Sequence, residues 1–214
     1  GCGLRSDSLI SYNTDGWILI PLAGALMIGG LGYPVLSELV RRARERVRGW
    51  LRGTPVSARR LSITTRMTLK GTAFLVVSAT LIIAVLEWRG FLAEMSTGTK
   101  WLNAFFSGVT PRTAGFNSID YADAHPITLM VTDIYMFIGG GSAGTAGGIK
   151  ITTAVVLLAA MLAEFRGREA TTVGHRTVPK TVVRQAMTVA AAGVVAVTAG
   201  VATMRICDPQ FTAD

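Results

Sequence analysis

The sequence has little charge and almost no cysteine. Charged residues make up 16% of its 214 residues, hydrophobic residues make up 50%, and the mean hydropathy is +0.46. This balance excludes an ordinary soluble domain, because such a chain has too few polar side chains to cover its surface in water. Cys2 and Cys207 stand at opposite ends of the chain and have no metal-binding spacing, so two free thiols are favoured over a disulfide.

Long apolar windows are the dominant feature of what is present. A helix needs roughly 20 apolar residues to cross the hydrocarbon core of a bilayer. Four windows approach or exceed this length, at 17–37, 71–86, 134–163 and 185–204. We therefore expect an all-α transmembrane fold with about four membrane spans.

Basic residues lie between these windows and are not spread over a surface. The stretch 41–70 contains ten arginines and lysines and one glutamate, and 164–184 is also basic. The positive-inside rule predicts that both loops are cytoplasmic. Because the membrane spans explain this charge, the net charge of +8 does not indicate nucleic-acid binding.

The segment 97–120 combines a short helix with a glycine-containing turn sequence. An amphipathic pattern over 99–110 predicts a helix about half as long as a crossing, which suits a re-entrant helix ended by Pro111. The following TAGFN, residues 113–117, suits extended backbone whose carbonyls point at a ligand. An external turn is the alternative.

The third window is too long and too rich in glycine for one straight helix. Residues 134–163 would extend about 45 Å at ~1.5 Å per residue. Six glycines lie within 139–148, and each costs on the order of 1 kcal/mol of helix propensity relative to alanine. We expect two half-helices joined by a loop, although these glycines also suit close helix packing. Lys150 follows the loop and is either functional or directed to the cytoplasmic interface.

A partial internal repeat relates the two halves of the chain. Ile28-Gly29-Gly30 and Ile138-Gly139-Gly140 lie 110 residues apart, and each comes late in a helix that leads to a basic loop. Gly115 precedes Gly139 by 24 residues, and Gly1 precedes Gly29 by 28. The pattern predicts a unit of helix, re-entrant loop and helix, with Gly1 as the remnant of an earlier loop.

Such a unit suits an ion pathway. Backbone carbonyls can replace the water around an alkali cation without holding the ion too tightly, and a helix C-terminus adds partial negative charge. The runs SGVTPRTAGFNSID and FIGGGSAGTAGGIKITT, with GLRSDSL to IGGLGYPVL, resemble the Ktr/Trk/HKT superfamily of potassium transporters, closest to the KtrB-type membrane subunit.

The resemblance implies a K⁺-channel-like fold of helix–pore-loop–helix repeats, of which this chain is a fragment. Residues 1–66 would be the end of repeat 2, with a filter remnant, a span at 17–40 and a cytoplasmic basic loop. A complete repeat 3 at 67–170 would have a span at 68–88, a pore helix at 99–110, a filter at 113–117 and a broken span at 126–163. Residues 171–214 would start repeat 4, with a span at 181–204.

It also implies site residues. The selectivity filter would include Thr113, Ala114, Gly115, Phe116 and Gly1, with K⁺ bound by the backbone carbonyls of Thr113, Ala114 and Gly115. The gating loop would comprise Gly139, Gly140, Gly141, Ser142, Gly144, Thr145, Gly147, Gly148 and Lys150. Cys2 stands where the family has an aromatic residue, which departs from the pattern near Gly1.

The implied function is potassium transport across the cell membrane and not an enzymatic reaction. K⁺ would be the transported ion, with Na⁺ as a candidate coupling ion and no covalently bound cofactor. The implied partners are the lipid bilayer, a second copy in a homodimer and a cytosolic nucleotide-binding regulatory subunit of the KtrA/TrkA type. Two alternatives are a secondary transporter for an organic solute, whose glycine-broken helix would bind it at mid-membrane, and a non-conducting fragment.

Overall fold

The chain forms two compact units, residues 1–152 and 153–214, which are described separately. The computed structural model describes residues 8–53, 61–111, 115–121, 124–141, 147–167, 172–173 and 176–207. These residues are helical apart from short connections and one pair of two-residue strands, so the predicted all-α class is confirmed.

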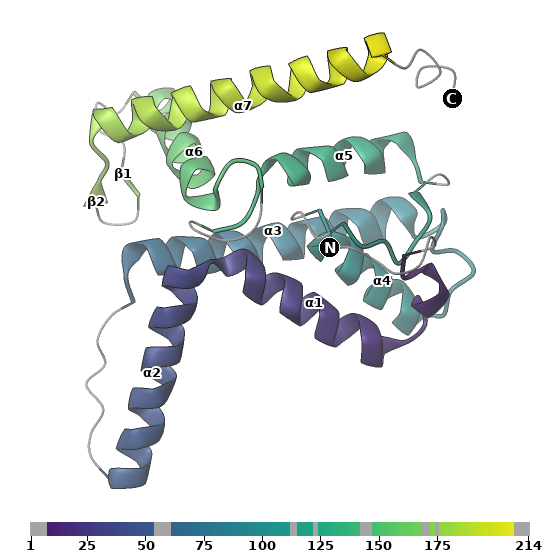
Figure 1. Cartoon of the computed structure of the whole chain (residues 1–214), viewed down its shortest axis with the longest axis horizontal. Helices are drawn as coiled ribbons and strands as arrows, with labels where there is room; N and C mark the ends of the chain where they lie inside the picture. The colour runs from purple at the N-terminus through teal and green to yellow at the C-terminus, as the bar shows by residue number, and fades with distance from the viewer. Residues whose placement is uncertain are drawn as a thin grey trace. The chain divides into compact units, whose positions relative to one another are not determined.

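The helices follow one another along the chain, joined by non-helical segments (Figure 1). The first unit contains η1 (Ile10–Tyr12), α1 (Gly16–Leu31), α2 (Tyr33–Arg52), α3 (Ile63–Glu87), α4 (Thr97–Val109) and α5 (Pro126–Phe137). Helix α6 (Ile151–Phe165) begins at the boundary, and the second unit adds the antiparallel strands β1 (Thr172–Val173) and β2 (Arg176–Thr177) and helix α7 (Lys180–Cys207).

Among the described residues, two helices are long and apolar enough to cross a membrane. They are α3, with 25 residues, and α7, with 28. Helices α1 and α2 qualify as a third span if the bent pair is counted as one, and α5 and α6 are shorter apolar helices. A count of about four spans stays a prediction, because it requires α5 and α6 to cross the membrane together.

The segment 17–40 is not one straight span. Helix α1 ends at Leu31, and the chain turns by 108° before α2. Gly32 adopts φ 85° and ψ 152°, a conformation open to glycine. Pro34 lies in the first turn of α2, where its missing N–H is tolerated, and it would have broken a continuous helix at this point. Both residues are tolerable inside a membrane span, which is why the sequence did not predict the break.

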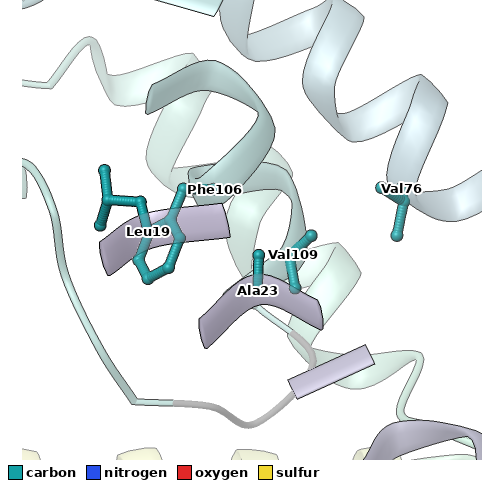
Figure 2. Close-up of a cluster of buried hydrophobic side chains, with 5 residues drawn as sticks. All are labelled: Leu19, Ala23, Val76, Phe106 and Val109. Atoms are coloured by element: carbon teal, nitrogen blue, oxygen red, sulfur yellow. The ribbon is translucent and has the colours of Figure 1, made fainter. Parts of the chain in front are cut away.

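The core of the first unit lies where α1, α3 and α4 meet. Leu19 and Ala23 of α1 pack with Val76 of α3 and with Phe106 and Val109 of α4 (Figure 2). These five side chains are all buried. Because lipid tails are as apolar as these side chains, close packing and not escape from water holds such helices together in a membrane.

Helix α4 approaches α3 closely at Gly108. A Cβ at this position would lie 2.8 Å from the Thr80 hydroxyl and 2.9 Å from the Thr80 backbone nitrogen. Backbone atoms cannot move aside as a flexible side chain can. Gly108 therefore sets the distance between the two helices.

We expect Gly108→Ala to destabilise the full-length protein that contains this chain, because overpacking lowers the free energy of unfolding by roughly 1–3 kcal/mol. The measurement is the melting temperature in detergent, which should fall. Gly98→Ala is the matched control, because Gly98 lies in the same helix and a Cβ there would have nothing within 4 Å. Equal melting temperatures for the two variants would show that Gly108 does not set the α3–α4 distance.

Candidate functional site

The candidate filter follows directly from the C-terminus of α4. Helix α4 has 13 residues, about 20 Å at ~1.5 Å per residue, which is too short to cross a bilayer. The Thr110 N–H and hydroxyl both donate to the Phe106 carbonyl, which closes the last turn. The partial negative charge of this helix end therefore faces the chain that follows.

After α4 the described chain resumes at Gly115, and residues 115–117 are not helical. Gly115 has φ +70°, a left-handed conformation that residues with a side chain rarely adopt. Phe116 packs against the α1–α3–α4 core, whereas Gly115 itself is exposed. Three filter residues expected from the sequence, Thr113, Ala114 and Gly1, lie outside the described residues.

The N-terminal segment of the chain lies directly against this path. The Asn117 N–H donates to the Ser8 hydroxyl at 2.9 Å, and the Leu9 N–H donates to the Asn117 carbonyl at 2.9 Å. These residues are more than a hundred positions apart in sequence. The structure thus brings the segment after Gly1 and the segment after Gly115 side by side.

Polar side chains of α4 hold both segments in place. The Asn103 amide donates to the Asn13 carbonyl at 2.7 Å and to the Thr99 carbonyl at 3.0 Å. Ser107, also on α4, is hydrogen-bonded to the Tyr121 side chain. Asn103 and Ser107 are both buried, so these bonds form away from solvent and fix the two segments to one helix.

A buried carboxylate anchors the far end of the filter segment. Glu87, at the end of α3, is 1% exposed and accepts hydrogen bonds from the His125 N–H, at 2.9 Å, and from the Thr128 hydroxyl. Both donors belong to the start of α5. Gly90 leaves room for the carboxylate, because a Cβ there would collide with Glu87 Oε2. Glu87 therefore ties α5 to α3.

The glycine-rich sequence after α5 breaks the helix, as far as the structure describes it. The Gly139 N–H donates to the Ile149 carbonyl, the Ile149 N–H to the Phe137 carbonyl and the Ile151 N–H to the Gly140 carbonyl. These bonds fold the two ends of the loop against each other. The described loop residues are Gly139, Gly140, Gly141, Gly147, Gly148 and half-buried Lys150, whereas Ser142, Gly144 and Thr145 lie outside the described residues.

Two of these glycines are required by close backbone approaches. A Cβ at Gly139 would collide with the Gly147 carbonyl oxygen. Gly148 has φ +72°, and a Cβ there would lie 2.7 Å from the Phe137 carbonyl oxygen. The described ends of the loop therefore pack backbone against backbone, and side chains at these two positions would push them apart.

The glycine loop is attached to the end of α1. The Gly141 N–H donates to the Gly30 carbonyl at 2.7 Å, and a Cβ at Gly141 would collide with the Leu31 carbonyl oxygen. Gly30 and Gly140 are corresponding residues of the two sequence repeats. The structure therefore joins the two glycine segments that the repeat relates.

Glu87 and Asn103 were not predicted from the sequence as residues of the site. Glu87 ends an apolar run beside Trp88 and reads as an interfacial charge, and Asn103 reads as a polar residue on an amphipathic helix. The anchoring role of Glu87 follows only from its bonds to His125 and Thr128, and that of Asn103 only from its bond to Asn13. A polar residue within the apolar pattern of α4 is the one available signal.

Comparison with known proteins gives one consistent family. Residues 1–208 match the family described as TrkH: Cation transport protein. Ktr system potassium uptake protein B of Bacillus subtilis (strain 168) is 31% identical over 210 residues, which cover 97% of this chain and 44% of that protein. Potassium/sodium uptake protein NtpJ of Enterococcus hirae is 32% identical over 189 residues, which cover 88% and 39%. The chain thus spans less than half the length of these relatives.

A solved structure shares the fold. The crystal structure of the potassium transporter TrkH from Vibrio parahaemolyticus matches with a TM-score of 0.68, over 87% of this chain and 38% of that chain. The sequences are 19% identical in this match, so the likeness concerns the fold alone.

We expect Glu87→Ala to increase amide hydrogen–deuterium exchange in the segments around 115–121 and 124–128 of the full-length protein. Removing the carboxylate leaves the His125 N–H and the Thr128 hydroxyl without their acceptor, at a cost of about 1–3 kcal/mol for each buried group. Glu94→Gln, a change at an exposed acid in the same region, is the control and should leave exchange unchanged. Unchanged exchange in Glu87→Ala would contradict the anchoring role.

Proposed function

This chain belongs to the TrkH family of cation transport proteins, and from that premise we propose that it forms part of a membrane pathway for potassium ions. The family is one of transport proteins, so the chain is not an enzyme, and it is a multi-pass membrane protein. The proposal extends to this chain the potassium uptake that the names of its relatives state.

The observation that carries the proposal is the path from α4 through Gly115. We propose that α4 is a re-entrant pore helix and that the backbone carbonyls of Thr113, Ala114 and Gly115 coordinate dehydrated K⁺. The left-handed backbone at Gly115 and the helix end that faces it support this assignment. Phe116 would hold the filter against the core, and Gly1 would belong to the preceding filter.

We assign gating to the glycine loop, residues 139–148 with Lys150. A loop at membrane depth is tolerated only where protein or a water-filled cavity lines it. The hydrogen bond from Gly141 to the end of α1 supports a loop that lies across the pathway and is held there by a neighbouring repeat. Helices α5 and α6 would then be the two halves of one broken span.

The proposed topology places both basic loops, 41–70 and 164–184, in the cytoplasm, with the protein in the cell membrane. In our proposal the full-length protein forms a homodimer and binds a cytosolic nucleotide-binding regulatory subunit of the KtrA/TrkA type. Coupling to Na⁺ is part of the proposal, and the name of the Enterococcus hirae relative, a potassium/sodium uptake protein, supports it.

We expect Gly115→Ser in the full-length protein to weaken the preference for K⁺ over Na⁺. A side chain at φ +70° costs roughly 1–2 kcal/mol, so the backbone should relax and move the carbonyls away from their positions around the ion. The measurement is rubidium and sodium uptake in a host that lacks potassium transport. Gly98→Ser, at an exposed position of α4, is the control. An unchanged uptake ratio would reject Gly115 as a filter residue.

We expect Gly141→Ala to raise rubidium flux without changing ion preference. The added Cβ would collide with the Leu31 carbonyl and displace the Gly141 N–H from Gly30, which would release the loop from α1. Gly24→Ala, on α1 with nothing within 4 Å, is the matched control. A lower flux at equal protein amount would count against a loop that obstructs the pathway.

A further inference from the structure

Helix α2 is strongly amphipathic. At 100° per residue, its apolar residues fill one side of the helix and its arginines fill the other side and both edges. The apolar side comprises Leu36, Leu39, Val40, Ala43, Val47, Trp50 and Leu51, and the basic residues are Arg41, Arg42, Arg44, Arg46, Arg48 and Arg52.

The direction of α2 is fixed at its start. It leaves α1 at a bend of 108°, close to a right angle, and it runs crosswise to α3 (Figure 1). Helix α3 is long and apolar enough to cross a membrane, so a helix that runs crosswise to α3 runs along the membrane surface. Because only Gly32 separates α2 from α1, α2 cannot move away from that surface as a whole.

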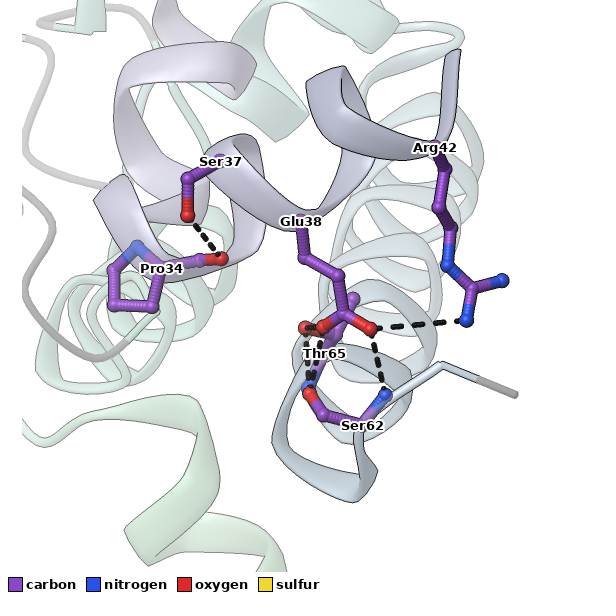
Figure 3. A network of polar contacts seen from close by, with 6 residues as sticks. All are labelled: Pro34, Ser37, Glu38, Arg42, Ser62 and Thr65. Carbon is purple, nitrogen blue, oxygen red and sulfur yellow. Dashed lines mark hydrogen bonds and ion pairs between the residues drawn. The ribbon is translucent and has the colours of Figure 1, made fainter. Parts of the chain in front are cut away.

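A carboxylate on α2 holds this direction. Glu38 accepts hydrogen bonds from the Thr65 hydroxyl at 2.5 Å and from the Ser62 N–H and hydroxyl at 2.9 and 2.8 Å (Figure 3). Arg42 lies 3.8 Å from the same carboxylate. The hydroxyl of Thr65, followed by the two donors of Ser62, lowers the pKa of Glu38 from 4.5 to about 2, so the anchor stays ionised at neutral pH.

The apolar side of α2 is unpartnered beyond this anchor. Val47 lies nine positions after Glu38 and therefore on the opposite side of the helix. Its side chain is 55% exposed, and those of Trp50 and Leu51 are 83% and 70% exposed. Within the described part of the chain, the stripe is partly buried at Leu36 and Leu39 and is exposed at Val40, Val47, Trp50 and Leu51.

An arginine edge runs beside that stripe. Leu36 and Val40 of the stripe line an open groove of about 550 Å³ on α2, together with Tyr33, Ser37, Glu45 and the arginines Arg41, Arg44 and Arg48. Arginine guanidinium groups bind phosphate oxygens in pairs of hydrogen bonds. An apolar surface joined to such an edge matches the boundary between acyl chains and phosphate headgroups.

We propose that α2 lies flat on the membrane, with its apolar stripe among the upper acyl chains and Arg41, Arg44 and Arg48 on the phosphates of anionic phospholipids. The amphipathic pattern, the arginine-rich polar side and Trp50 at one end are the features of interfacial helices. Basic residues at a surface of anionic lipid are attracted to it, and the match of charge supports lipid over an acidic protein. This inference does not depend on which ion the protein transports.

The test uses two spin-labelled cysteines on opposite sides of α2 in the full-length protein. Val47→Cys and Glu45→Cys are made in a background in which every cysteine of the full-length protein, Cys2 and Cys207 among them, is replaced by serine. The proteins are reconstituted into phosphatidylcholine vesicles with or without phosphatidylglycerol. The measurement is the accessibility of each label to two relaxing agents, oxygen dissolved in lipid and a water-soluble nickel chelate. With phosphatidylglycerol, the label at 47 should be accessible mainly to oxygen and the label at 45 mainly to the chelate. The label at 47 should become more accessible to the chelate without anionic lipid.

Neutralising the arginine edge tests the phosphate contacts. Arg44→Gln with Arg48→Gln should make the label at 47 more accessible to the chelate in phosphatidylglycerol vesicles. The matched control, Arg89→Gln with Arg205→Gln, removes two exposed arginines elsewhere and should have no effect. Equal chelate access at 45 and 47 in both vesicle types would overturn the proposal and leave the stripe open to a protein partner. Identical depth in both vesicle types would overturn the role of anionic lipid.

Discussion

The arrangement depends on one constraint, that irregular backbone in an apolar surrounding must find hydrogen-bond partners within the protein. The chain meets it at the path after α4 and at the loop after α5 by bonding each of them to a segment far away in sequence. The Gly141 N–H bonds to the Gly30 carbonyl, and Leu9 and Asn117 bond through their backbones. Gly30 and Gly141 are both buried, so without this bond the loop after α5 would leave a buried N–H and a buried carbonyl unsatisfied. The same bonds therefore fix the position of the candidate site.

Glycine makes these contacts sterically feasible. At Gly139 and Gly141 a side chain would occupy the space of a carbonyl oxygen, and at Gly108 it would push α4 away from α3. The glycines are thus not all alike, because Gly24, Gly98 and Gly200 have nothing within 4 Å. A helix pair drawn together by small residues and a loop folded on itself by small residues are two uses of the same steric property.

Some of these features could be predicted from the sequence and others could not. Six glycines in ten residues lower helix propensity enough to predict the break before α6, and the apolar windows predict helices. The break at Gly32 was not predicted, because a cluster of Gly29, Gly30, Gly32 and Pro34 is also tolerated inside a membrane span. Glu87 and Asn103 could not be recognised, because their partners are distant in sequence and a buried polar residue is defined by its partners.

The two related Ile-Gly-Gly motifs lead to different structures, and the residues after them explain why. After Gly30 the chain continues into α2, which carries six arginines and whose apolar side is a stripe. After Gly140 it continues through the glycine loop into α6, whose sequence ITTAVVLLAAMLAEF contains one charged residue, Glu164. A helix with six arginines cannot enter hydrocarbon without a large cost, whereas α6 can. In our proposal, therefore, the same kind of break directs α2 to the membrane surface, whereas α6 continues through the membrane.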